Sequence, residues 1–390
     1  MKKLLTRIIP GLAWLSLAAA QVPPPPAGMP TPAAPQLGAD SYILMDFDSG
    51  TVLVEHQPDL RVDIASITKL MTSYVVFQEL AAGKVSLDDA VPVSEKAWRT
   101  EGSRMFIEPD MQVSVEELLM GLIVQSGNDA SVALAEFLAG TEEAFAGVMN
   151  YYAGQLGMAH THFVNATGLP DPEHYSTARD TALLSAAIIR DFPNYYTWYS
   201  EKEYTFNNIR QHNRNNLLWR DPAVDGLKTG HTEAAGYCLA SSAKREGMRL
   251  VGVVMGSSSE QARASESQSL LNYGFRFFET LQLYKAGEQL AEGRVWKGVS
   301  EQVRLGLPDD LFITIPRGRY DDLEARVEMQ PELVAPLELG AEVGRIVIQL
   351  DDEPVASRAL VTLEGVAPAG FFGRAWDGIR LWAGSFFDDE

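Results

Sequence analysis

Apolar residues follow two different periods along this chain, and the order of those periods restricts the fold more than any other feature. Short apolar runs at 42–46 and 51–55 flank Asp48-Ser49-Gly50, which is typical of a β-hairpin. Helical patterns then dominate the sequence at 66–82, 115–125, 130–139, 142–156 and 178–190. Strand patterns return at 237–242 and 250–255, and a further helix is expected over 265–281. This order predicts an α+β domain over residues 38–282, in which helices pack on an antiparallel sheet.

A second domain is expected over residues 283–367, where the composition changes. Short strand patterns separated by turn signals repeat at 303–305, 311–315, 325–329, 343–350 and 359–363. This repetition is typical of a small all-β sandwich.

Residues 368–390 are expected to form an amphipathic helix. One face would carry Phe372, Trp376, Ile379, Trp382, Ala383 and Phe386. Such an aromatic face favours binding at a membrane interface, and docking on the protein's own body is the alternative. The acidic end, Asp388-Asp389-Glu390, weakens any attraction to anionic lipid.

The N-terminus is typical of an exported protein. Lys2, Lys3 and Arg7 precede an apolar run at 8–17, and Ala18-Ala19-Ala20 is suited to cleavage, so residues 1–20 are predicted to be a signal peptide. An uncleaved anchor is the alternative, although the apolar run is short for a membrane span. Residues 21–37 are rich in Pro and Ala and are expected to form a linker.

Two properties of the composition exclude whole classes of function. The formal net charge is −20, from 32 basic and 52 acidic residues, which disfavours a nucleic-acid partner. The single cysteine, Cys238, lies in an apolar run and is expected to be a buried strand residue rather than a catalytic thiol.

The pair Ser66-x-x-Lys69 is the first candidate for catalysis. Residues three apart share one face of a helix, and a helix that begins near Ser66 would direct free N–H groups at its hydroxyl. Ser241-x-x-Lys244 matches the same pattern, but it falls in a strand and hairpin, from which the lysine would point into solvent. We therefore expect only the first copy to be functional.

Two further triplets follow the first pair in order. Ser126-Gly127-Asn128 lies between two helical patterns, and Lys228-Thr229-Gly230 leads into the strand region. Each triplet is common by chance, whereas all three motifs in this order are a specific signal.

With these motifs the chain resembles the low-molecular-mass penicillin-binding proteins, which are serine-type D-alanyl-D-alanine carboxypeptidases of peptidase family S11. The resemblance extends from about Asp40 to the terminal helix and includes the segments 65–69, 125–129, 225–232, 273–280 and 315–318. It implies a penicillin-binding/β-lactamase-like domain with helices on both sides of the sheet, followed by the β domain. It also implies export to the periplasm and a peptidoglycan stem peptide as substrate.

The residue types suit amide hydrolysis. Ser66 is expected to be the nucleophile, Lys69 the base and Ser126 the group that passes a proton to the departing amine. Asn128 would hold Lys69 and a substrate amide, while Lys228 would place positive charge beside Ser126.

Further residues are expected to bind the substrate. Thr229, Gly230 and the strand after them would bind the terminal carboxylate and pair with the peptide backbone. The resemblance implies an oxyanion hole made by the backbone N–H groups of Ser66 and His231. Arg214 and Arg263 match arginines that face the family's site, although an ordinary ion pair explains each almost as well.

The sequence therefore predicts a serine carboxypeptidase that removes the terminal D-Ala of stem pentapeptides through an acyl-serine, with a role in cell-wall maturation and cell shape. β-Lactams are expected to inhibit it covalently. The alternatives are a D,D-endopeptidase, a β-lactamase and a non-catalytic cell-wall scaffold. We expect the enzyme on the outer face of the inner membrane. No cofactor or metal is expected, since His160-x-His162 is more typical of a solvated turn.

Overall fold

The computed structural model describes residues 31–384, and its first part is built around a five-stranded antiparallel sheet. The strand order is β2 (Val52–His56), β1 (Ser41–Asp46), β9 (Met248–Ser257), β8 (Gly236–Arg245) and β7 (Val224–Thr232). The sheet therefore joins the predicted N-terminal hairpin to strands from two hundred residues later. The predicted signal peptide and residues 21–30 of the predicted linker lie outside the described residues.

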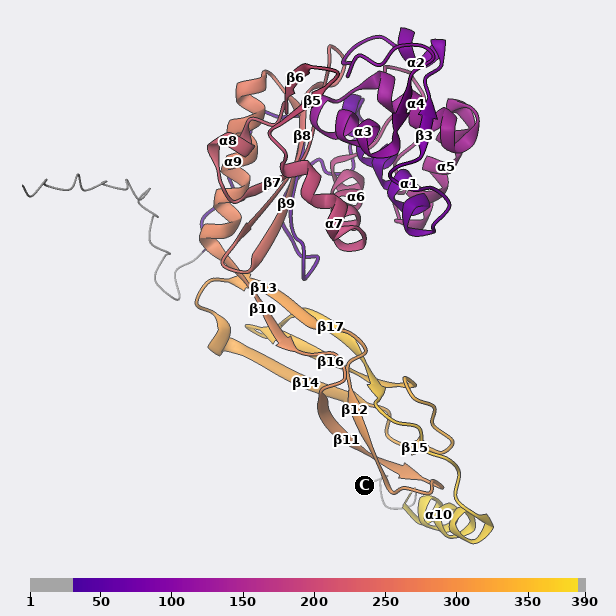
Figure 1. Ribbon diagram of the computed structural model, residues 1–390. Coiled ribbons are helices and arrows are strands. Elements are labelled where there is room, and N and C mark those ends of the chain that lie inside the picture. The colour runs from indigo at the N-terminus through magenta and orange to yellow at the C-terminus, as the bar shows by residue number, and fades with distance from the viewer. Residues whose placement is uncertain (1–30, 385–390) are drawn as a thin grey trace, which may run out of the picture.

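Helices cover both faces of this sheet (Figure 1). Because side chains alternate along a strand, β1 directs Ile43 and Met45 into one core and Leu44 into the other. The core of Leu44 lies under α9 (Glu260–Phe277), and the core on the opposite face lies under α6 (Ala178–Asp191) and α1 (Lys69–Ala81).

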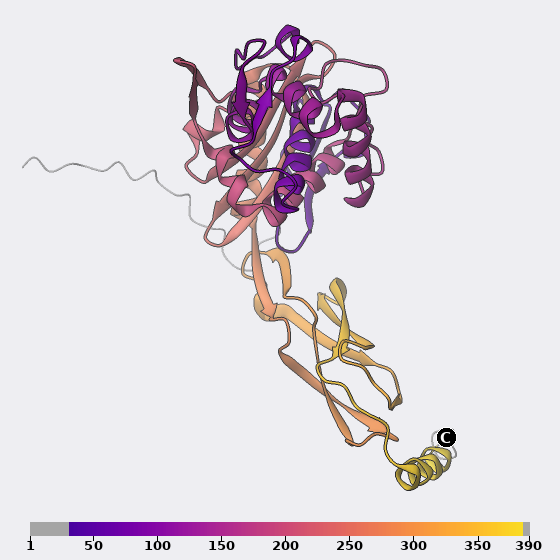
Figure 2. The same ribbon diagram turned by 45° about the vertical axis from the view of Figure 1, so that its right-hand side comes forward.

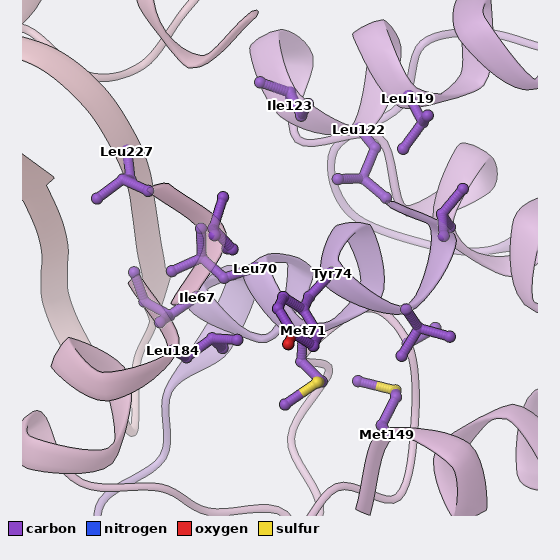
Figure 3. Close-up of a cluster of buried hydrophobic side chains, with 14 of the residues drawn as sticks. Ile67, Leu70, Met71, Tyr74, Leu119, Leu122, Ile123, Met149, Leu184 and Leu227 are labelled. Atoms are coloured by element: carbon purple, nitrogen blue, oxygen red, sulfur yellow. The ribbon is translucent and has the colours of Figure 1, made fainter. Parts of the chain in front are cut away.

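Helix α1 runs through the larger of the two cores. Figure 3 shows its residues Leu70, Met71 and Tyr74 surrounded by apolar side chains from other elements. Leu70 and Met71 are fully buried, so the helix that follows Ser66 is held on all sides. This explains the lack of a polar face in the pattern at 66–82.

The remaining elements of the first domain are short or lie on its helical side. They are η1 (Ala65–Thr68), β3 (Ala90–Pro92), α2 (Glu95–Arg99), β4 (Gln112–Ser114), α3 (Val115–Met120), η2 (Gly121–Gln125), α4 (Asn128–Ala139), α5 (Glu142–Gln155), α7 (Pro193–Tyr196), η3 (Thr197–Ser200), β5 (Glu203–Phe206), β6 (Ile209–His212) and α8 (Leu217–Arg220).

The second domain is all-β apart from one short turn of helix, η4 (Tyr320–Asp322). Its larger sheet has the order β14 (Leu323–Met329), β16 (Glu342–Leu350), β17 (Glu353–Thr362), β12 (Gln302–Gly306), β11 (Gln289–Trp296) and β15 (Leu333–Val334). A second sheet pairs β10 (Phe278–Tyr284) with β13 (Leu311–Pro316). Ile313 and Ile315 of the second sheet share a core with Ile346 and Ile348 of the first, which confirms the sandwich.

The two domains lie end to end (Figures 1 and 2). At the junction Thr280 Oγ1 donates to Asp46 Oδ2 at 2.6 Å, and Ser49 Oγ lies 2.6 Å from Thr314 Oγ1. Helix α10 (Phe371–Gly384) lies at the far end of the β domain. It touches that domain where the backbone N–H of Lys297 donates to Asp377 Oδ2 at 2.7 Å.

Two local expectations differ from the structure. The helix expected over 265–281 begins and ends earlier, and residues 278–284 form β10 instead, which crosses the predicted boundary at 282/283. Apolar residues at 277, 278 and 281 are compatible with a helical and with a strand pattern. Pairing with β13 determines that this segment is a strand. The helix expected over 115–125 is α-helical only to Met120 and continues as the π-helical turn η2.

No helix among residues 31–384 has the length and apolarity needed to cross a bilayer. The predicted linker is described only from residue 31, where it forms neither helix nor strand. It lies against α9, because Tyr273 donates its hydroxyl hydrogen to the carbonyl of Pro32, and the N–H of Gly38, the first residue after the linker, donates to Glu266.

Candidate active site

Ser66 and Lys69 lie on one turn at the start of the buried helix. Ser66 belongs to the tight turn η1, and Lys69 is the first residue of α1. The side-chain nitrogen Nζ of Lys69 lies 3.0 Å from Ser66 Oγ. Ser66 is partly accessible whereas Lys69 is fully buried, so the hydroxyl is open to a ligand and the amine beside it is shielded from water.

The surroundings of Lys69 suit a neutral amine. Its Nζ donates to Asn128 Oδ1 and to the carbonyl of Thr167, both at 2.6 Å. Neither oxygen has a hydrogen to give, so these two acceptors take the two N–H bonds of a neutral amine. Ser66 Oγ is a third acceptor for a charged Lys69, and in the neutral amine the lone pair takes that place and faces the Ser66 hydroxyl hydrogen. Asn128 is fixed in this orientation because its Nδ2 donates to the carbonyl of Glu101 at 2.5 Å.

Ser126 lies between η2 and α4 and contacts a second lysine of the site. It follows the π-helical turn η2 with a left-handed backbone, φ 65° and ψ 34°, and α4 begins two residues later at Asn128. This sharp change of direction allows Ser126 and Asn128 to face the same site. Lys228 Nζ donates to Ser126 Oγ at 2.9 Å, so each serine of the site has its own lysine.

Lys228, Thr229 and Gly230 lie on β7, which is the last strand of the sheet. Within the described residues, β7 pairs only with β8, so its other edge is available to an extended peptide. Gly230 permits β7 to approach the turn that carries Ser66, because a Cβ there would lie 2.8 Å from the carbonyl oxygen of Ile64.

The site gathers positive charge in a buried place. Burial lowers the pKa of Lys69 to about 7, and Arg214 acts in the same direction. Burial also lowers the pKa of Lys228 well below its usual range, and the charges of Lys69, Arg214 and Arg263 lower it further. An anionic ligand would offset this concentration of charge.

The two arginines differ in their surroundings. Arg214 is exposed. Arg263 is buried, and its Nη1 donates to the carbonyl of Gly230 at 3.3 Å, so it also supports β7. His231 is exposed at the end of the strand and stacks on Tyr237 with ring centroids 4.0 Å apart. All ten residues singled out from the sequence therefore lie around Ser66 or on the elements that border it.

The second Ser-x-x-Lys pattern and the single cysteine lie where the sequence predicted them, within the strand β8. Ser241 lies within β8 with its hydroxyl on the carbonyl of Gly252, and Lys244 is exposed. Cys238 is buried, and burial raises the pKa of its thiol to about 11. Among residues 31–384 no three His, Cys, Asp or Glu side chains cluster as metal ligands would.

Several groups that build the site are not apparent from the sequence. The carbonyls of Thr167 and Glu101 hold Lys69 and Asn128, but a backbone oxygen has no residue signature. Asp129 is buried and accepts the N–H groups of Met105 and Phe106, which fixes the loop that carries Glu101. A recognisable signal for Asp129 was its place directly after Asn128.

Comparison with known proteins agrees with this arrangement. A family model described as D-alanyl-D-alanine carboxypeptidase (peptidase family S11) matches residues 29–259, and one described as the C-terminal domain of penicillin-binding protein 5 matches residues 278–368. The chain therefore belongs to the S11 D-alanyl-D-alanine carboxypeptidase family.

Individual relatives cover nearly the whole chain. D-alanyl-D-alanine carboxypeptidase DacA of Escherichia coli K12 is 48% identical over 358 residues, which is 90% of this chain and 89% of the relative. DacC of the same strain is 46% identical over 98% of both chains. The crystal structure of penicillin-binding protein 5 from Haemophilus influenzae is similar with a TM-score of 0.84 and 46% identity, over 86% of this chain and 99% of that one.

Proposed function

We propose that this protein is a serine D-alanyl-D-alanine carboxypeptidase that removes the terminal D-Ala from peptidoglycan stem pentapeptides. The observation that carries the proposal is the contact of Lys69 with Ser66, in which a buried amine with a pKa lowered to about 7 faces a partly accessible hydroxyl. Its near full-length similarity to named carboxypeptidases supports the same activity.

In the acylation step Ser66 Oγ attacks the carbonyl of the D-Ala–D-Ala bond and Lys69 takes the hydroxyl proton. The backbone N–H groups of Ser66 and His231 would stabilise the oxyanion. Ser126, which contacts Lys228, passes a proton to the amine of the departing D-Ala and is reprotonated by the proton that Lys69 took from Ser66, so Lys69 is neutral again. Water then attacks the acyl carbonyl: its hydroxyl joins the shortened peptide, and its remaining proton restores the Ser66 hydroxyl.

Substrate binding is assigned to β7 and the charges beside it. The free edge of β7 would pair with the stem peptide, and Thr229 with Lys228 would receive its terminal carboxylate. Arg214 adds positive charge at the exposed side of the site, and Asn128 would hold a substrate amide. β-Lactams, which present a strained amide near a carboxylate, would acylate the same serine.

The test combines a fluorescent penicillin with a defined pentapeptide. Wild type and the matched variant Ser241→Ala should both be labelled, whereas Ser66→Ala should not. Mass spectrometry should detect a tetrapeptide and free D-Ala. Equal labelling of wild type and Ser66→Ala would overturn the assignment of the nucleophile. Steady turnover of the penicillin would indicate a β-lactamase, and cleavage of cross-links in sacculi alone would indicate an endopeptidase.

We also propose that residues 1–20 direct export, that the catalytic domain runs from residue 38 to the end of α9 at Phe277, and that α10 attaches the enzyme to the outer face of the inner membrane. Phe371, Phe372 and Trp376 of α10 are exposed at the end of the molecule opposite the catalytic domain. Large exposed aromatics at one tip favour a lipid interface. The β domain would then hold the site at a distance from the bilayer.

Sedimentation with phospholipid vesicles tests this attachment. A Phe372→Ser/Trp376→Ser double variant should lose binding to zwitterionic and anionic vesicles alike. Tyr151→Ser is a matched control, since Tyr151 and Trp376 have the same exposed fraction, 61%. Unchanged binding of the double variant would contradict the proposal.

A further inference from the structure

The turn that presents Ser66 has an unusual backbone. Ala65 adopts a left-handed conformation with φ 46°, which costs energy for a residue that has a Cβ. One side chain fixes this turn from within, because Thr68 Oγ1 donates to the carbonyl of Ala65 at 2.8 Å. The position of Ser66 therefore depends on what holds Thr68.

His174 holds Thr68 from outside the turn. Its Nε2 lies 2.7 Å from Thr68 Oγ1. The single hydrogen of that hydroxyl is already directed at Ala65, so the imidazole must be the donor. The other ring nitrogen, Nδ1, accepts the backbone N–H of Val164 at 3.1 Å. Both contacts are satisfied together only by a neutral ring with its hydrogen on Nε2.

The segment that begins at Val164 reaches the other half of the catalytic pair. The carbonyl of Thr167 accepts from Lys69, and the carbonyl of Ala166 accepts from Thr72 Oγ1 at 2.7 Å. At Gly168 a Cβ would lie 1.8 Å from the carbonyl oxygen of Ala65, so this segment packs directly on the nucleophile turn.

We infer that His174 is a positioning residue, whose neutral imidazole joins the turn that carries Ser66 to the segment whose Thr167 carbonyl orients Lys69. It touches neither substrate nor reacting atoms. This inference rests on the proposed acyl-serine activity.

The surroundings of His174 keep the ring neutral at ordinary pH. Its side chain is buried, with Phe163 edge-on to the ring, and burial lowers its pKa to about 4. Of the charged groups that face it, Asp171 raises this pKa, while His162 and Lys69 lower it. Protonation would place a hydrogen on Nδ1 and break the contact with the N–H of Val164.

The test measures the acylation rate constant of the full-length protein with a fluorescent penicillin. His174→Ala should slow acylation at least tenfold at pH 7.5. His174→Gln, whose amide offers one donor and one acceptor without titrating, should recover most of the rate. Met149→Ala, a core truncation on α5, is the control for stability, and it should acylate at nearly the wild-type rate.

A second readout separates positioning from simple loss of fold. Between pH 7 and pH 4, labelling of His174→Gln should fall less steeply than labelling of wild type. Equal rates for His174→Ala and wild type, or failure of His174→Gln to recover activity while folded by circular dichroism, would overturn the inference. If wild type itself forms no acyl-serine, the proposed function fails instead.

Discussion

The two domains bury different kinds of side chain. The catalytic domain buries two lysines, an arginine and several Asp, Asn, Ser and Thr residues, whereas the buried polar side chains described in the β domain are Thr314 and Thr362. Ion pairs of the β domain, such as Arg345 with Glu328 and Arg304 with Glu364, are exposed. Burying polar groups is costly unless each is paired, so the first domain maintains a connected network and the second relies on apolar cores.

This difference predicts in which domain a substitution of a polar residue should change activity or stability. In the catalytic domain, a substitution that removes one hydrogen-bond partner leaves a buried polar group unsatisfied and alters the chemistry of Ser66. In the β domain, a substitution that removes one member of an ion pair leaves the other in contact with water, so the free energy of unfolding should change little.

The largest effect is expected for Lys69→Ala. Loss of a general base lowers a rate by about 10²–10⁴-fold, and stopped-flow acylation by a penicillin measures it. Lys244→Ala, in the second Ser-x-x-Lys pattern, is the matched control, because that lysine is exposed on β8. A normal acylation rate in Lys69→Ala would remove the lysine from the mechanism.

A smaller effect is expected for Asp129→Ala. The carboxylate accepts the N–H groups of Met105 at 3.0 Å and of Ile107 at 3.3 Å, and both residues are buried. Two unsatisfied donors should lower the free energy of unfolding by about 3 kcal/mol, measured by urea denaturation. Asp129→Asn, which keeps one acceptor oxygen, should lose less. Equal stability of Asp129→Ala and wild type would show that the loop is held by other contacts.

Protonation of His174 should affect the free energy of unfolding as well as the acylation rate constant. Its pKa falls from 6.5 to about 4 on folding, so between these values the unfolded chain binds a proton that the folded protein does not. This proton uptake by the unfolded chain lowers the free energy of unfolding as the pH falls from 6.5 to 4, by roughly 3 kcal/mol in total. Above pH 6.5 the group is neutral in both states and the full stability is present. Urea denaturation at pH 7 and pH 4 should show a smaller loss for His174→Gln, and parallel losses would contradict the assignment.

The smallest effect is expected in the β domain. Arg345 contacts Glu328 at 2.6 Å, but more than half of each side chain is exposed. Arg345→Ala should change the free energy of unfolding by about 0–1 kcal/mol and leave acylation unchanged. A loss of several kcal/mol would show that surface pairing stabilises this domain more than its apolar cores suggest.

Much of this organisation was predictable from the sequence, and the remainder has physical reasons. The order of periods predicted the sheet and the sandwich. The three motifs in their order predicted that Lys69, Ser126 and Lys228 lie close together, and the structure places them so. Strand β10 was missed because its apolar residues also suit a helix. The left-handed Ala65 and the π-helical turn before Ser126 depend on tertiary contacts rather than on local preference. His174 was missed because a lone histidine carries no motif.

The central claim is that burial makes Lys69 a base at neutral pH, and the acylation rate constant of wild type between pH 5.5 and pH 9 tests it most directly. Because burial, and then Arg214, lower the pKa of Lys69 to about 7, the rate should rise through pH 7 and level off above it. In Arg214→Gln the midpoint should move to higher pH, since one positive charge is gone. A rate that stays constant over this range, or a midpoint that Arg214→Gln leaves in place, would contradict the account.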